Sequence, residues 1–148
     1  MVKAEGAVGD ALQQALVDLI ALELQCKQAH WNIKGDRFRS LHLALDEVVA
    51  LVRTDLDEVA ERLATLGGNP DGRAATVART KSIDDIDGGD LPVDKTYLQM
   101  AEKIQVVCDK MRQALPDVDD ADPVSGDLLI GIIGGLEQQA WFLRAATQ

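Results

Sequence analysis

The chain of 148 residues has the length of one domain, and its 25 acidic against 15 basic residues leave a formal net charge of −10. This charge has the wrong sign for a protein that holds nucleic acid by its phosphates, but it suits one that attracts cations. No stretch approaches the ~20 apolar residues of a membrane span, and residues 1–10 lack a signal-peptide pattern, so we expect a cytoplasmic protein without membrane association.

The first half of the chain carries two long amphipathic patterns joined by a short link. Apolar residues recur at three- and four-residue spacing over residues 10–33 and again over 37–66, which predicts two helices. The link between them contains Gly35 and is short, so the two helices should be antiparallel neighbours. Gly67-Gly68-Asn69-Pro70 follows the second pattern and is typical of a helix end.

The second half begins with an unusually long connection. Residues 67–93 span 27 positions, where compact domains use ~4–6, and we expect a short helix there, at residues 74–78 or 82–86. Two more helices follow, at 94–115, ended by Pro116, and at 125–146, capped by Ser125. The predicted fold class is therefore all-α: one ferritin-like domain over 1–148, a four-helix bundle with one long crossover carrying a short helix.

The last predicted helix contains three glycines. Gly131, Gly134 and Gly135 each cost about 1 kcal/mol against alanine inside a helix. The usual compensation is the close approach of a neighbouring backbone, and we expect one here.

Both histidines of the chain lie near two pairs of acidic residues. His42 and Asp46 are four residues apart, as are Asp57 and Glu61, so each pair shares one face of the second helix. The eleven residues from Asp46 to Asp57 close to within ~20° of three helical turns, which places both pairs on one stripe. They also rise ~16 Å along the axis, so one chain cannot bring both pairs to a single metal ion.

A second copy, packed antiparallel about a two-fold axis midway between the pairs, removes this difficulty. His42 and Asp46 of one copy then face Asp57 and Glu61 of the other, and His30 can reach the same place. Two imidazoles and three carboxylates suit iron and its neighbours, including zinc. Spacing alone leaves solvated surface residues as an equal alternative. The chain has no Glu-x-x-His, so it lacks the ordinary di-iron site inside one bundle.

This stretch resembles the DNA-binding proteins from starved cells (Dps), a family of mini-ferritins. The spacing of the five candidate ligands matches the ferroxidase ligands of that family, and the likeness extends over about residues 12–146. The other matching motifs are His30-Trp31-Asn32, Gly35, Phe38, Ala60-Glu61-Arg62, Gly67-Gly68-x-Pro70, Asp127-Leu128 and Leu136-Glu137-x-x-x-Trp141-x-Leu143-Arg144-Ala145.

The resemblance implies an oxidoreductase and an assembly. On this view the chain is a ferroxidase that oxidises Fe(II), with hydrogen peroxide as the oxidant, at sites between subunits. A hollow homododecamer would store the ferric mineral and limit oxidative stress. Iron is the expected metal, and zinc or another divalent ion could occupy the same site.

The resemblance also implies roles for single residues. His30, His42 and Asp46 would act with Asp57 and Glu61 of a second copy. Trp31 would be either an electron donor or a packed aromatic residue. The acidic residues expected at an ion-entry pore, which could instead form a solvated loop, are Asp122 and Asp127.

Two other functions stay open. The chain could be a DNA-binding protein of the nucleoid without a dominant iron role, or a metal-dependent hydrolase that uses the same site. Against the first, the net charge is −10, only Lys3 precedes the first predicted helix, and no basic residue follows Arg144. We therefore expect weak or no DNA binding at physiological salt. Cys26 and Cys108 are expected to be buried thiols and not ligands.

Overall fold

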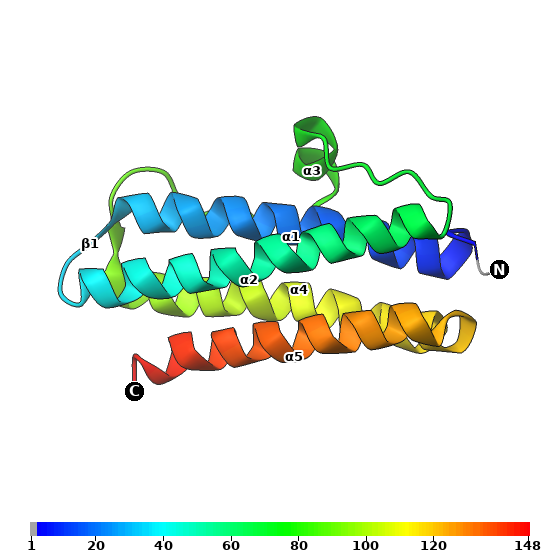
Figure 1. Ribbon diagram of the computed structural model, residues 1–148. Helices are drawn as coiled ribbons and strands as arrows, with labels where there is room; N and C mark the ends of the chain where they lie inside the picture. Colours follow the sequence, from blue (N-terminus) through cyan, green and yellow to red (C-terminus); the bar gives the residue numbers. More distant parts are fainter. Residues whose placement is uncertain (1–2) are drawn as a thin grey trace.

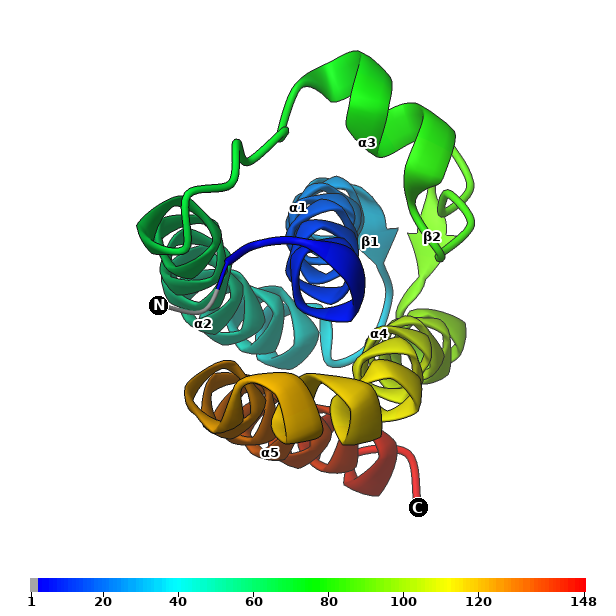
Figure 2. The ribbon, with the colours of Figure 1, turned by 90° about the vertical axis from the view of Figure 1, so that its right-hand side faces the viewer.

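The computed structural model describes residues 3–148 as a bundle of four long helices with a short fifth helix outside it (Figures 1 and 2). The predicted all-α fold with one long crossover is confirmed. In chain order the elements are α1 (Gly6–Asn32), β1 (Ile33–Lys34), α2 (Phe38–Thr65), α3 (Ala74–Thr80), β2 (Leu91–Pro92), α4 (Val93–Ala121) and α5 (Pro123–Ala145). No helix within residues 3–148 is both long and apolar enough to cross a membrane.

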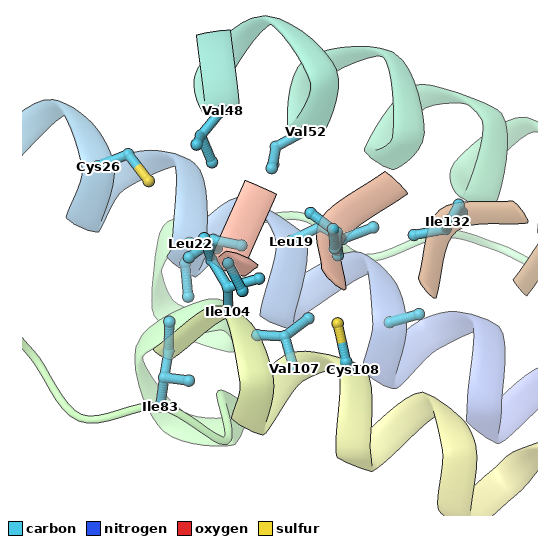
Figure 3. Close-up of a cluster of buried hydrophobic side chains, with 14 of the residues drawn as sticks. Leu19, Leu22, Cys26, Val48, Val52, Ile83, Ile104, Val107, Cys108 and Ile132 are labelled. Carbon is cyan, nitrogen blue, oxygen red and sulfur yellow. The ribbon is translucent and has the colours of Figure 1, made fainter. Parts of the chain in front are cut away.

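The core lies between the four long helices and is almost wholly aliphatic. Each helix contributes one apolar stripe, as its three- and four-residue spacing requires. The crossover adds Ile83, which is buried against α4 (Figure 3). The other labelled side chains of this cluster are Leu19, Leu22, Cys26, Val48, Val52, Ile104, Val107, Cys108 and Ile132.

The end of α2 shows why the glycine pair follows it. Gly67 adopts a φ of +84°, a conformation that side chains with a Cβ rarely adopt. Its N–H donates to the carbonyl of Ala64 at 2.9 Å, and the N–H of Gly68 donates to that of Leu63 at 3.0 Å. These two bonds form a Schellman motif, which satisfies carbonyls that the helix end would otherwise leave unpaired.

The boundary between α4 and α5 was predicted wrongly. Helix α4 does not stop at Pro116 but continues to Ala121, and α5 begins at Pro123. Val118 is fully buried, so packing of this last turn offsets the hydrogen bond that Pro116 cannot donate. Ser125 is not the cap either, because Asp122 occupies the N-cap position and a proline takes the first helical position.

Two smaller expectations also need correction. Helix α1 begins at Gly6, earlier than expected, because Val8 extends its buried stripe by a further turn. No backbone approaches Gly131 or Gly134 within the described chain, and a Cβ on either would meet open space. Gly135 does face a neighbour, because its Cβ would lie 3.5 Å from the side chain of Leu51.

Polar side chains of α1 fasten the crossover to the bundle. Asp18 is 1% exposed and accepts hydrogen bonds from the backbone N–H of Ser82 at 2.6 Å and from its hydroxyl at 2.9 Å. Gln13 exchanges two hydrogen bonds of 2.9 Å with the backbone of Asp71, and Gln25 donates to Asp85 at 2.9 Å. These contacts explain why residues 82–86, offered as a possible helix, are instead irregular, with a bend at Ser82 and Ile83: α1 satisfies several of their polar groups.

The aromatic residues gather at one end of the bundle. The link between α1 and α2, the start of α4 and the end of α5 meet there, where β1 pairs in parallel with β2 (Figure 1). Arg37 ties them together, because its guanidinium donates to the carbonyl of Ala146 and to Asp94 and lies over the ring of Tyr97. All five aromatic residues of the chain are near this end: Trp31, Phe38, Tyr97, Trp141 and Phe142.

Candidate metal centre

The two histidines stack face to face at the aromatic end. Their ring centroids are 3.6 Å apart and the rings are tilted by 18°. Nδ1 of His30 lies 2.8 Å from the carbonyl oxygen of His42, and Nδ1 of His42 lies 3.0 Å from that of His30. A carbonyl oxygen only accepts, so each Nδ1 must carry the proton and donate it. Each Nε2 is then left with a free lone pair, which is the form of imidazole that binds a metal.

Local chain geometry places these rings. His30 lies in the last turn of α1 and His42 in the second turn of α2, so the short antiparallel link brings them level. Arg37, in this link, has a φ of 59°, the left-handed region that residues with a Cβ seldom occupy. Its bonds to Ala146 and Asp94 stabilise that conformation. The ring of Phe38 packs 5.0 Å from that of His42 and limits its rotation.

Asp46 completes this half of the site and already has a cationic partner. Nζ of Lys27 lies 2.9 Å from Oδ1 of Asp46, and Nδ1 of His30 lies 3.4 Å from the same oxygen. The hydrogen bond from Lys27 and the positive charge of its ammonium lower the pKa of Asp46, so this carboxyl is ionised.

Sequence reasoning missed Lys27, although the antiparallel link sets residue 27 opposite residue 46. Its ammonium also lies 5.7 Å from the ring of Trp31, which is 67% exposed. In the single chain Trp31 is thus a surface residue beside these groups.

The other acidic pair lies apart on the same helix. Asp57 and Glu61 are exposed, and neither forms an ion pair with any residue in the 3–148 range. Within that range no group of three or more His, Cys, Asp or Glu side chains could hold a metal ion. The candidate ligands of one chain therefore form two separate groups: the two histidines with Asp46, where α1 and α2 meet, and the acidic pair Asp57 and Glu61 farther along α2.

Asp122 has a structural role in this chain. Nη2 of Arg62 lies 2.8 Å from its carboxylate, and Ser125 also donates to it. The hydrogen bond from Ser125 and then that from Arg62 lower the pKa of Asp122, which is only 3% exposed. A buried carboxylate that is already neutralised is poorly placed to line a pore. Asp127, one helical turn after Pro123, is exposed and remains the pore candidate.

Asp55 is a second acidic residue that the sequence reading passed over. It interrupts the buried stripe of α2 between Val52 and Val59, and it is 6% exposed. Among the described residues nothing donates to its Oδ2. Burial raises the pKa of Asp55 to about 6, and the charge of Glu58 adds to the rise. A polar residue at a core position of an amphipathic helix is the signal that could have found it.

The two cysteines lie in the core as expected. Both are free and fully buried, and burial raises the pKa of each thiol to about 12. They are protonated at neutral pH and unsuited to metal binding.

Comparison with known proteins adds a family and a fold. Residues 9–148 match the family model described as a ferritin-like domain. The "DNA protection during starvation protein" of Mycolicibacterium smegmatis is 37% identical over 138 residues, covering 93% of this chain and 75% of the relative. The "DNA protection during starvation protein 2" of Deinococcus radiodurans is 34% identical over 138 residues. The alignment covers 93% of this chain but only 57% of that relative.

A solved structure agrees with these sequence relatives. The tetragonal form of Mycobacterium smegmatis Dps superimposes with a TM-score of 0.91 at 35% sequence identity. The match covers 98% of this chain and 90% of that one.

Proposed function

Because the chain belongs to the ferritin-like Dps family, we propose that it is a ferroxidase that stores iron, with each metal site shared between two copies. His30, His42 and Asp46 of one copy would bind Fe(II) together with Asp57 and Glu61 of the partner. The stored ferric mineral would lie inside a hollow shell of twelve copies.

The observation that supports this proposal most directly is the paired orientation of the histidines. Both Nδ1 atoms donate to backbone carbonyls, so both Nε2 atoms are preset as metal ligands. The acidic pair supports the same proposal, because Asp57 and Glu61 share a stripe with His42 and form no ion pair among residues 3–148.

The residues suggest how the reaction would proceed. Neutral imidazoles and anionic carboxylates bind Fe(II), and the carboxylates then favour the extra positive charge of Fe(III). Two ferrous ions each give one electron to one molecule of hydrogen peroxide, whose O–O bond breaks. Water bound by the ferric ions loses protons as the oxide forms. Asp46 would leave Lys27 for the metal, since one carboxylate oxygen cannot serve both at full strength.

Iron also needs a route to the interior. We propose that Asp127 contributes to it, because its carboxylate is exposed near the start of α5 in a strongly acidic region. Carboxylates grouped round a pore raise the local concentration of a divalent cation.

An anaerobic Fe(II) titration followed by peroxide tests the proposal, with the mass of the particle measured in the same preparation. Saturable binding, fast oxidation and a soluble ferric core in a particle of about twelve copies are expected. His42→Ala should slow oxidation by roughly 100-fold or more while the helical signal persists. Glu47→Gln, which removes an exposed carboxylate of α2 outside the stripe, is the matched control and should oxidise iron normally.

A mixing experiment tests whether the site is shared. His42→Ala and Glu61→Ala chains should each be inactive alone. In a mixed dimer, one site carries both substitutions and the other carries neither. Random mixing of equal amounts should therefore restore about one quarter of the wild-type sites. Two inactive variants that stay inactive after dissociation and reassembly would show that each chain holds its own site.

DNA protection by direct binding is a second candidate, because relatives from two organisms bear that name. The net charge of −10 opposes it, since twelve such chains would repel phosphate from all sides. We expect no electrophoretic shift of duplex DNA at 0.15 M salt. A shift at low protein concentration that disappears only at higher salt would favour the DNA-binding function instead.

A further inference from the structure

Left-handed backbone conformations fall on glycine throughout residues 3–148, with the exception of Arg37. The φ of Arg37 is 59°, which is strained for a residue with a Cβ. Gly35 lies two residues earlier in the same link and has a φ of +125°, which glycine adopts without strain. An arginine at the second position therefore points to a role of its side chain.

The guanidinium of Arg37 reaches the two helices that meet the link. It donates to the carbonyl of Ala146, directly after α5, and to the carboxylate of Asp94 in the first turn of α4. Carbonyls at the end of a helix lack intrahelical partners and favour a cation, so Arg37 caps α5. Figure 1 shows the C-terminus at the same end of the bundle as the link, although Arg37 and Ala146 are 109 residues apart.

The backbone of Arg37 starts the helix that carries His42. Its carbonyl accepts from the N–H of Ser40 at 3.1 Å and from that of Leu41 at 3.3 Å, at the beginning of α2. The dihedral angles of Arg37 therefore set the direction in which α2 leaves the link. His42 follows within the second turn, and the ring of Phe38, the residue after Arg37, packs against the ring of His42.

The histidine pair depends on that direction. His30 donates to the carbonyl of His42 at 2.8 Å, and His42 donates to that of His30 at 3.0 Å. Both bonds cross between α1 and α2, and a relative shift of about 1 Å would take them beyond hydrogen-bond range. A ring that loses its acceptor can carry the proton on Nε2 instead, and a protonated Nε2 has no lone pair for a metal ion.

We propose that Arg37 is a positioning residue of the metal centre: anchored on the end of α5 and the start of α4, it holds the start of α2 so that both histidines keep Nε2 free. This inference rests on the proposed function, because it assigns the rings to metal binding. Arg37 is not a ligand itself, since a guanidinium has no lone pair to give. It acts through the backbone of α2 and the ring of Phe38.

Magic-angle-spinning NMR of metal-free protein labelled with ¹⁵N-histidine tests the positioning, because the shift of a ring nitrogen reports whether it carries a proton. At about pH 8.5, above the ordinary pKa of imidazole, the wild type should carry both protons on Nδ1. Arg37→Ala should add signals of protonated Nε2. The matched control is Arg39→Ala, which removes an exposed arginine of the same turn and should match the wild type.

Co(II) affinity is the second readout. Binding to assembled Arg37→Ala should weaken about tenfold or more, as when a group that orients a metal ligand is lost. Asp18→Ala removes the acceptor of Ser82 at the crossover and leaves the link intact. It should keep the ring signals and the Co(II) affinity of the wild type, which separates positioning from a general loss of stability.

Arg37→Gly keeps the test sharp if Arg37→Ala does not fold. Glycine adopts a φ of 59° without strain, so this variant lacks only the anchors of the side chain. It should still show protonated Nε2 and weaker Co(II) binding. An Arg37→Gly protein that matches the wild type in both readouts would show that the side chain positions nothing.

The two readouts separate this inference from the proposed function. Wild-type ring signals or wild-type Co(II) affinity in Arg37→Ala would overturn the inference, and so would a wild type that already carries a proton on Nε2. A wild type that binds no Co(II), while Arg37→Ala still moves protons to Nε2, would refute the proposed metal site and leave the positioning of the rings standing.

Discussion

Two sets of polar side chains on neighbouring helices differ in where their partners lie. On α1, Asp18, Gln13 and Gln25 are all bonded to the crossover of the same chain. On the outer face of α2, Asp57 and Glu61 have no ion-pair partner among the described residues. Polar groups that a single chain satisfies hold the fold together. Exposed carboxylates on one stripe of a helix are hydrated in the single chain, and under the proposed function a cation and a second copy would replace that water.

Among these residues, replacing Asp18 should lower the stability of the protein most. Asp18→Ala leaves the partly buried backbone N–H of Ser82 and its hydroxyl without their acceptor and should reduce the free energy of unfolding by about 3 kcal/mol. Asp18→Asn keeps one oxygen and should lose less. Urea unfolding at fixed protein concentration measures both. An Asp18→Ala protein as stable as the wild type would mean that the crossover does not depend on α1.

A bound metal ion should stabilise the protein only through the proposed ligands, and not through the polar residues that hold the crossover. A divalent ion at 100 times its dissociation constant raises the free energy of unfolding by ~2.7 kcal/mol if it binds only the native state. Wild type and Asp18→Ala should gain equally from Zn(II), whereas His42→Ala should gain nothing. Thermal unfolding with and without Zn(II) measures this. Equal gains in all three proteins would place the metal elsewhere.

Arg62 follows the candidate ligand Glu61 in the sequence, but its side chain forms an ion pair with Asp122 within the same chain. Arg62→Met leaves a buried carboxylate without its cation and should cost about 2 kcal/mol of stability. Arg62→Lys keeps the charge and should cost less. The number of Co(II) ions bound per dimer should not change in either variant. If Arg62→Met alone lost Co(II) sites, Arg62 would be needed for metal binding and not only for stability.

Asp55 belongs to neither set and should have the smallest effect. Its pKa is raised to about 6, so its contribution to stability is present at low pH and is lost as the pH rises through about 6. The free energy of unfolding of Asp55→Asn should therefore exceed that of the wild type by about 1 kcal/mol at pH 8. This difference should vanish below pH ~4. A gain that is independent of pH would assign the effect to packing.

These two sets also differ in how well the sequence predicts them. Helical spacing predicts that Asp46 and Asp57 lie on one stripe, because that depends only on the pitch of α2. It does not predict that Lys27 pairs with Asp46, or that Asp18 binds Ser82, because both depend on contacts between segments far apart in the chain.

The errors in the predicted helix ends have the same cause. Local preference suggests that Pro116 ends a helix, but burial of Val118 outweighs that preference. In the sequence Asp122 resembles the other acidic residues near it, and only the structure shows that Arg62 and Ser125 donate hydrogen bonds to its carboxylate. Patterns within one helix are therefore predictable from the sequence, and partners across helices are not.

The concentration of aromatic residues at one end gives the molecule a built-in optical reporter. Both tryptophans, Trp31 and Trp141, lie at the end that carries the histidine pair, and both are more than half exposed. The crossover, the acidic pair on α2 and most of the core contain no chromophore that absorbs near 280 nm. Intrinsic fluorescence will therefore respond to events at the histidine end, and it can follow the arrival of a quenching ferric ion there in unlabelled protein.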